Sequence, residues 1–285
     1  WSSDVCSSDL EENDYDDEKV NRLLRWKAIN ENLGGVRTIL DIGAATGAFS
    51  IPLSKMGYEV THFDLSQDMI NKAILKSKDM DNIKFVKGNA VDLSLFEEDE
   101  FDLVLCFDGA ISFSGKNSNK VIKESCRVGK KVMLTVSSKS CMVATWLNYS
   151  LSKFGRIHPS VKDMMVTGYF NKANYDDVSE LTSIDEIKAY DIKELSDILI
   201  SNNMRVIECR SLGSLTHLYL LHLYRQYNYQ EVNKKINEIS IDNDFIELCD
   251  YYDKEVMNCG MGSFRRAGII AIADKINDNS IEKSK

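Results

Sequence analysis

The pattern of apolar and polar positions divides the first half of the chain into alternating strands and helices. Short apolar runs rich in β-branched residues predict strands, and apolar residues three and four positions apart predict helices. The predicted strands are 36–42, 58–64, 83–87, 101–107 and 131–137, and the predicted helices are 20–33, 48–56, 67–78 and 121–127. Strands that alternate with helices in this way indicate βαβ units and a parallel sheet with helices on both faces.

The second half of the chain is less regular. Residues 139–190 mix aromatic and polar positions without a clear strand, and residues 215–258 have a helical pattern. A helix over 192–202 and strands over 204–211 and 267–273 complete the sheet pattern. Insertions of this length in a compact domain are usually lids or binding elements. The sequence therefore predicts a doubly wound, seven-stranded α/β fold with helical lid insertions.

The domain boundaries that we expect follow from these patterns. The first 18 residues are rich in Ser and Asp, then acidic, and show no periodicity, so we expect a disordered or non-native leader over 1–18. The segments expected after it are an α/β core over 19–138, a lid insertion over 139–190, a core helix and strand over 191–212, a helical insertion over 213–262, a final core strand over 263–275 and a polar tail over 276–285.

Composition narrows the range of partners. The chain of 285 residues has 35 Lys and Arg against 44 Asp and Glu, a net charge of -9 without a dense basic run, which disfavours nucleic acid as a partner. It lacks the run of about 18 apolar residues that a membrane-spanning helix needs, so we expect no membrane partner. The seven scattered cysteines, without a C-x-x-C spacing, indicate a cytoplasmic location. The acidic clusters lack a calcium-loop pattern, so we expect no metal site.

The strongest chemical signal lies at residues 39–49, ILDIGAATGAF. An apolar strand leads into the acidic residue Asp41, which is followed by a turn of small residues and then by a helix. Small side chains let the backbone approach a ligand closely, and the first turn of a helix exposes N–H donors. This segment is therefore the first candidate for a binding site.

The segment resembles motif I of the class I S-adenosylmethionine-dependent methyltransferases, D/E-x-G-x-G-x-G, with Ala45 in place of the middle glycine. We expect this replacement to be tolerated if the φ angle of Ala45 is negative. A dinucleotide-binding G-x-G-x-x-G would fall on Gly43, Ala45 and Ala48, with one glycine of three in place. A methyltransferase is therefore favoured over a nicotinamide oxidoreductase.

Two further strand ends extend the resemblance. Asp64 ends the second predicted strand, 21 positions after Gly43, where a carboxylate can accept hydrogen bonds from both ribose hydroxyls. Ser66 or Asp68 is better placed than Asp64 to cap the next helix. Asn89 stands where the family commonly has Asp, and its amide oxygen can accept a hydrogen bond from the adenine amine, although a turn asparagine is the alternative.

The resemblance implies a set of site residues. The residues that it assigns to the cofactor are Asp41, Gly43, Ala44, Ala45, Gly47, Phe49, Asp64, Leu65, Met69, Asn89, Ala90 and Phe107. Asp108, after the fourth predicted strand, is the leading candidate for orienting the acceptor or acting as a base, with a cofactor-side contact or a turn before Gly109 as alternatives. The weaker candidate bases are His158, His217 and His222.

The resemblance also implies a fold and a function. The fold is a mostly parallel sheet with an antiparallel last strand, and the function is in-line methyl transfer from S-adenosylmethionine. The acidic composition and the two lid-sized insertions, taken with these motifs, favour a small-molecule acceptor. Two alternatives stay open, a protein or peptide methyltransferase whose insertions form a docking groove, and a non-catalytic S-adenosylmethionine-binding module. The motifs specify neither the acceptor nor the oligomeric state.

Overall fold

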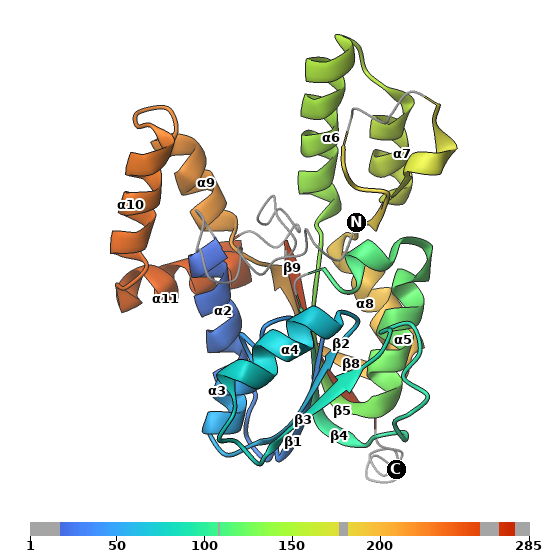
Figure 1. The fold of residues 1–285 in the computed structure, drawn as a ribbon. Coiled ribbons are helices and arrows are strands. Elements are labelled where there is room, and N and C mark those ends of the chain that lie inside the picture. Colours follow the sequence, from blue (N-terminus) through green and yellow to red (C-terminus); the bar gives the residue numbers. More distant parts are fainter. Residues whose placement is uncertain (1–17, 108, 177–181, 257–267, 277–285) are drawn as a thin grey trace, which may run out of the picture.

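A seven-stranded sheet forms the centre of the computed structural model, which describes residues 18–107, 109–176, 182–256 and 268–276 (Figure 1). The strand order is β3-β2-β1-β4-β5-β9-β8. In the described part of the chain, β9 is antiparallel to both neighbours and the other six strands of this sheet share one direction, which confirms the predicted fold class. The strands are β1 Thr38–Ile42, β2 Glu59–Asp64, β3 Ile83–Lys87, β4 Phe101–Cys106, β5 Gly129–Val136, β8 Met204–Ser211 and β9 Ile269–Lys275.

Helices cover both faces of the sheet because consecutive strand residues point to opposite sides. Ile39 of β1 packs with α2 and α3, whereas Leu40, the next residue, packs in the cluster that contains residues of α5 and α8. The helices of the sheet layers are α2 Glu18–Glu31, α3 Ser50–Lys55, α4 Gln67–Lys76, α5 Ser118–Val128 and α8 Ile192–Ser201, with the short η1 Ser112–Asn117 before α5. The core therefore consists of two apolar layers, one on each face of the sheet.

The strand order reverses beside β1. From β1 the chain proceeds outward through β2 and β3, and it then returns to place β4 on the other side of β1. The loops after β1 and β4 therefore leave the sheet toward opposite faces, which opens a crevice at the carboxyl ends of these two strands. Ligands of open α/β sheets bind at this position.

The first insertion forms a small unit with its own apolar core. Its helices are α6 Lys139–Phe154 and α7 Pro159–Thr167, followed by β6 Tyr169–Asn171, η2 Lys172–Asn174 and β7 Glu186–Lys188. Trp146, Met164 and Phe170 are fully buried in this core. The prediction that residues 139–190 contain no strand was wrong, since β6 and β7 pair antiparallel. At three residues each, they are too short for an alternating pattern to be visible.

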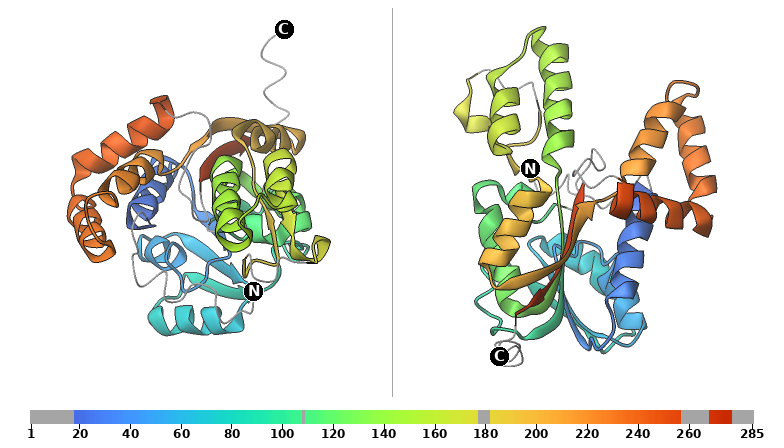
Figure 2. Two further views of the ribbon diagram at one scale, coloured as in Figure 1. Left: turned by 90° about the horizontal axis from the view of Figure 1, so that it is seen from above. Right: turned by 180° about the vertical axis from the view of Figure 1, so that it is seen from behind.

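The second insertion packs against the main core. It contains α9 Ser214–Leu223, α10 Tyr229–Ile239, α11 Asn243–Tyr251 and η3 Tyr252–Val256, where the sequence indicates a helical region over 215–258. Leu220, Val232 and Cys249 join the apolar cluster of α2. The two insertions follow the carboxyl ends of β5 and β8, and they stand on two sides of that end of the sheet (Figure 1 and Figure 2).

Several predicted segments differ in their ends or lie outside the described residues. The first helix ends at Glu31, before Gly34-Gly35, and β9 begins at Ile269 rather than at Ala267, which lies outside the described residues. Residues 1–17 of the predicted leader and 277–285 of the predicted tail also lie outside them, whereas Glu18 begins α2. Among the described residues, none of the helices has the length and apolar character needed to cross a membrane.

Candidate functional site

The loop between β1 and α3 has left-handed backbone at alternate positions. The φ angles are +72° at Gly43, +45° at Ala45 and +91° at Gly47. A β-carbon on Gly43 would lie 2.9 Å from the β-carbon of Ala110, and one on Gly47 would lie 2.6 Å from the side chain of Ile51. Glycine is therefore required at these two positions by both conformation and space.

The negative φ that would make alanine tolerable at position 45 is not found. Its φ of +45° is a left-handed conformation, which costs a residue with a β-carbon about 1–2 kcal/mol. The Ala45 N–H donates to Oδ2 of Asp64 at 2.8 Å, so the turn is fixed partly by a side chain of β2. The middle position of the motif therefore requires the same left-handed backbone as its two glycine neighbours.

We expect Ala45→Gly to raise the free energy of unfolding by about 1 kcal/mol, because glycine adopts this φ without a steric penalty and loses only part of the gain to unfolded-state entropy. Urea unfolding of the cofactor-free protein measures the change. Ala48→Gly is the matched control, since Ala48 does not have a positive φ, and it should lower stability by about 0.5–1 kcal/mol. If both variants were less stable than the parent protein, the conclusion that Ala45 is strained would be wrong.

The carboxylate of Asp64 is held by backbone hydrogen bonds on both of its oxygens. It is 9% exposed, its Oδ2 accepts from Ala45 N–H at 2.8 Å, and its Oδ1 accepts from Ser66 N–H at 2.7 Å. Burial raises the pKa of Asp64, while backbone donors including these two act to lower it. Each carboxylate oxygen has a second lone pair, so the ionised group can still accept hydrogen bonds from a ribose. The residue fits the proposed role at a nucleoside.

Backbone hydrogen bonds join the ends of the first three strands. Gly43 N–H and Ala44 N–H donate to the carbonyl oxygen of Phe63 at 2.8 and 3.2 Å, and Gly88 N–H donates to that of Asp64 at 3.0 Å. The loop after β1, the end of β2 and the turn before Asn89 therefore lie side by side. The strand ends that carry the predicted nucleoside contacts meet at one edge of the sheet.

Asp41 is a residue of β1 and lies beside β4. Its side chain is buried, and its register partner on β4 is Leu105, next to Cys106. Burial and the nearby Asp41 carboxylate raise the pKa of the Cys106 thiol. The negative charge of Asp41 is therefore positioned where the strand order reverses.

The residues after β2 and β3 are more exposed. Leu65 is 65% exposed, and Asn89 is exposed, with its Oδ1 accepting from Val91 N–H at 3.0 Å as in an Asx turn. The amide oxygen of Asn89 has a second lone pair, so the turn leaves it able to accept from an adenine amine. Ser66 Oγ accepts from Met69 N–H at 3.4 Å, which confirms the predicted cap of α4. Ala90 is half-buried and packs against the core.

An aromatic row extends from α2 to the end of β4. The ring centroid of Phe49 lies 5.3 Å from that of Trp26 and 5.1 Å from that of Phe107, and the Arg25 guanidinium lies 5.5 Å from the Phe49 ring. Phe49 and Phe107 are buried, so both rings make most of their contacts with protein. Asp108, the catalytic candidate, lies outside the described residues.

His62 is a site-region residue that the sequence did not single out. It is fully buried on β2, and its Nδ1 lies 2.8 Å from Ser50 Oγ. Burial lowers the pKa of His62 to about 4, and the nearby backbone of Ala45 opposes this shift. The two-residue spacing from Asp64 is the signal that could have found it, since residues i and i+2 of a strand share a face.

The candidate histidine bases have separate surroundings. His158 is buried in the first insertion, where its ring stacks on Phe154 at 5.3 Å and its Nδ1 caps α7. His217 is buried on α9, and burial lowers its pKa, whereas His222 on the same helix is exposed. His158 is therefore a structural residue of the first insertion.

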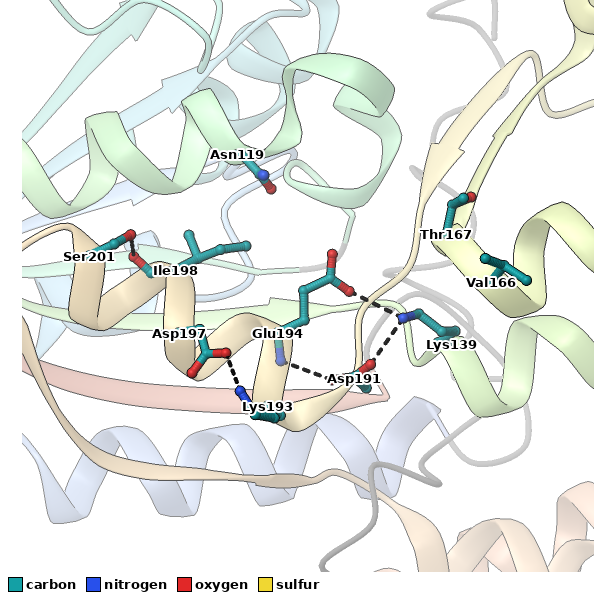
Figure 3. A pocket seen from close by; sticks show the side chains of 10 residues that line it. All are labelled: Asn119, Lys139, Val166, Thr167, Asp191, Lys193, Glu194, Asp197, Ile198 and Ser201. Carbon is teal, nitrogen blue, oxygen red and sulfur yellow. Dashed lines mark hydrogen bonds and ion pairs between the residues drawn. The ribbon is translucent and has the colours of Figure 1, made fainter.

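A charged crevice of about 680 Å³ lies at the base of the first insertion (Figure 3). Lys139 reaches between Asp191 and Glu194, with its Nζ 2.9 and 3.3 Å from their carboxylate oxygens, and Lys193 pairs with Asp197. The described residues that line it include no predicted site residue, and α5 and α8 belong to the opposite face of the sheet from His62. At this crevice the first insertion is linked to the N-terminal end of α8 by ion pairs of Lys139 with Asp191 and Glu194.

Comparisons with known proteins agree with this geometry. Residues 39–131 match the sequence model of a family described as a methyltransferase domain. A demethylmenaquinone methyltransferase of Staphylococcus carnosus is 26% identical over 198 residues, which cover 64% of this chain and 80% of the relative. The protein of the same name from Staphylococcus saprophyticus is 30% identical over 162 residues, which cover 52% and 67%.

A solved structure of a SAM-dependent methyltransferase from Methanosarcina mazei has a similar fold. Its TM-score against this chain is 0.53 at 20% sequence identity, and the match covers 88% of this chain and 98% of the other. At this identity the likeness shows the shared fold alone.

Proposed function

Because this chain belongs to the class I S-adenosylmethionine-dependent methyltransferases, we propose that it transfers the methyl group to a small-molecule acceptor. The observation that carries the proposal is the loop over 43–47, whose left-handed backbone is held by Asp64 at the edge where the strand order reverses. S-Adenosylmethionine supplies, when bound, a methyl group on a sulfonium that is already activated toward a nucleophile. The protein then has to orient the acceptor and exclude water.

Different site residues would contact different parts of the cofactor. The Asp64 carboxylate would accept hydrogen bonds from the ribose hydroxyls, and the Asn89 amide oxygen would accept from the adenine amine. The exposed Leu65 side chain would pack on the adenine ring. The small residues at 43–47 would let the backbone approach the rest of the cofactor.

Three observations support a small molecule as the acceptor. Two relatives are named for demethylmenaquinone, a small molecule. The chain carries a net charge of -9, which disfavours a polyanionic substrate such as nucleic acid. Two helical insertions follow the carboxyl ends of β5 and β8, where they are suited to cover an acceptor.

The test combines binding with turnover. Calorimetric titration with S-adenosylhomocysteine should show one site. An assay of its release should show turnover with members of a panel of small phenols and quinols that includes the reduced, quinol form of demethylmenaquinone. Pools of peptides serve as the comparison. Turnover with peptides alone would favour the protein-methyltransferase alternative, and the absence of cofactor binding would remove the proposal.

We expect Asp108→Asn to lower kcat about 10–100-fold while the affinity for S-adenosylhomocysteine stays within about twofold, because a group that orients or deprotonates the acceptor acts after the cofactor is bound. Kinetics and calorimetry on the same preparation measure both. Asp102→Asn, near the opposite end of β4, is the control and should leave both values unchanged. Equal losses in turnover and cofactor affinity would assign Asp108 to the cofactor side.

A cytoplasmic location is also part of the proposal. Cys106, Cys126, Cys209 and Cys249 are thiols that are buried or half-buried. Burial raises the pKa of each thiol, which keeps it protonated and poorly reactive. Thiols of this kind are typical of proteins in reducing compartments.

A further inference from the structure

The segment over 109–117, which lies between β4 and α5, contacts both the loop over 43–47 and the first insertion. A β-carbon on Gly43 would lie 2.9 Å from the β-carbon of Ala110, so the start of the segment packs closely against that loop. Phe113, in the middle of the segment, packs against the apolar core of the first insertion. The segment therefore joins two parts of the molecule that are far apart in the sequence.

Glu186 of β7 makes polar contacts at this junction. Its Oε1 accepts a hydrogen bond from the Lys116 N–H at 2.9 Å and another from the hydroxyl of Tyr169 on β6. Asn171 Nδ2 donates to the same Tyr169 oxygen at 3.2 Å, which helps to hold the hydroxyl in place. One carboxylate of the first insertion thus binds the main chain of the segment outside it.

Gly115 leaves room for the Glu186 side chain. Its φ of +53° is a left-handed conformation that favours glycine. A β-carbon at this position would lie 2.1 Å from Cδ and 2.2 Å from Cγ of Glu186, far inside van der Waals contact. A larger residue would therefore displace the carboxylate from the Lys116 N–H. Both the backbone and the space at Gly115 are adapted to one side chain of the first insertion.

This junction follows the strand ends at which methyl transfer is proposed. The register of β1 and β4 pairs Ile42 with Cys106, so the carboxyl ends of the two strands lie side by side. The loop over 43–47 and the segment over 109–117 follow these ends, where open α/β sheets bind their ligands. Methyl transfer needs the acceptor in line with the methyl group, and a small displacement of the groups that position it costs rate.

We propose that Glu186 is a positioning residue, which holds the backbone at Gly115 and Lys116 so that the segment over 109–117 forms the acceptor side of the site. The proposal rests on the proposed function, since it takes the ends of β1 and β4 as the place of methyl transfer. Glu186 acts through the main chain of the segment and not by contact with the reacting groups. The first insertion thereby shapes the acceptor site from a distance.

The test compares Glu186→Ala with Glu186→Gln, which keeps an oxygen acceptor for the Lys116 N–H without the charge. Kinetics with the panel acceptor that the parent protein methylates fastest give kcat and KM, and calorimetry gives the Kd for S-adenosylhomocysteine. Hydrogen exchange of the cofactor-free proteins, followed by mass spectrometry, compares the segment over 109–117 with α6. Asp185→Asn is the matched control, since Asp185 is the adjacent residue and its carboxylate lies 3.8 Å from Lys172 Nζ.

We expect Glu186→Ala to lower kcat/KM for the acceptor about tenfold while the Kd stays within about twofold. Hydrogen exchange should become faster in the segment over 109–117 and stay unchanged in α6. Glu186→Gln should keep at least about a third of the parent kcat/KM, and Asp185→Asn should match the parent in every measurement. Unchanged kcat/KM, unchanged exchange in the segment, or a Gln variant no better than Ala would overturn the proposal. Equally faster exchange in α6 would also overturn it, because the first insertion itself would then have loosened.

A double-mutant cycle with Gly115→Ala separates this proposal from the proposed function. If the parent protein methylates no acceptor, the proposed function fails, and urea unfolding of the cofactor-free proteins decides the role of the contact. Gly115→Ala should lower the urea midpoint more in the parent than in Glu186→Ala, where the overlapping side chain is absent. Equal shifts in both backgrounds would show that Glu186 does not hold the segment.

Discussion

Replacing Asp64 with alanine should weaken the binding of S-adenosylhomocysteine about a hundredfold, or about 2.7 kcal/mol. The carboxylate would no longer accept from the ribose hydroxyls, and the N–H groups of Ala45 and Ser66 would lose the acceptor that fixes the loop. Both effects act on the cofactor-bound state, so the loss exceeds that of a single neutral hydrogen bond. Calorimetric titration of the purified variant measures the change.

Two further variants test whether this loss of affinity comes from the Asp64 carboxylate. Asp68→Ala, in the first turn of α4, removes an exposed carboxylate four positions away and should leave the Kd within about twofold. Asp64→Asn keeps an acceptor without the charge and should fall between the parent and Asp64→Ala. Unchanged affinity in Asp64→Ala would show that the ribose does not meet the end of β2.

The second large effect is a loss of stability on acidification that depends on His62. Burial lowers the pKa of His62 from 6.5 to about 4 in the folded protein. As the pH falls below 6.5, His62 binds a proton in the unfolded chain but stays neutral in the folded protein. The free energy of unfolding therefore decreases until the pH reaches about 4. Over this window the loss amounts to about 3 kcal/mol, since each tenfold difference in proton affinity corresponds to about 1.4 kcal/mol.

The measurement compares the parent with His62→Phe, which keeps a ring beside Phe85 but cannot be protonated. Asp253 acts in the opposite direction, because burial raises its pKa to about 6 and its contribution to stability is lost as the pH rises from 3.8 to 6. The difference between the two proteins therefore isolates His62. Urea unfolding at pH 7.5 and 4.5 should show the variant gaining about 2–3 kcal/mol relative to the parent, whereas parallel curves would contradict the prediction.

The sheet and its acidic strand ends could be predicted because their signals are local in the sequence. An apolar run that ends in Asp41 or Asp64, followed by a turn and a helix, places each carboxylate at the carboxyl end of a parallel strand. The two short strands β6 and β7 could not be predicted in this way. Each has three residues, and their pairing joins positions 15 to 19 residues apart through a segment without a repeating pattern.

The sequence by itself determined the strand pattern, the position of the loop over 43–47 and the acidic residue near the end of each of the first two strands. The backbone conformation of Ala45 was decided by tertiary structure, because Ala45 lies 19 positions from Asp64 and its N–H is held by that side chain. A local rule favours a negative φ for alanine, but hydrogen bonds from a neighbouring strand outweigh it. Such contacts between distant positions leave no periodic trace along the chain.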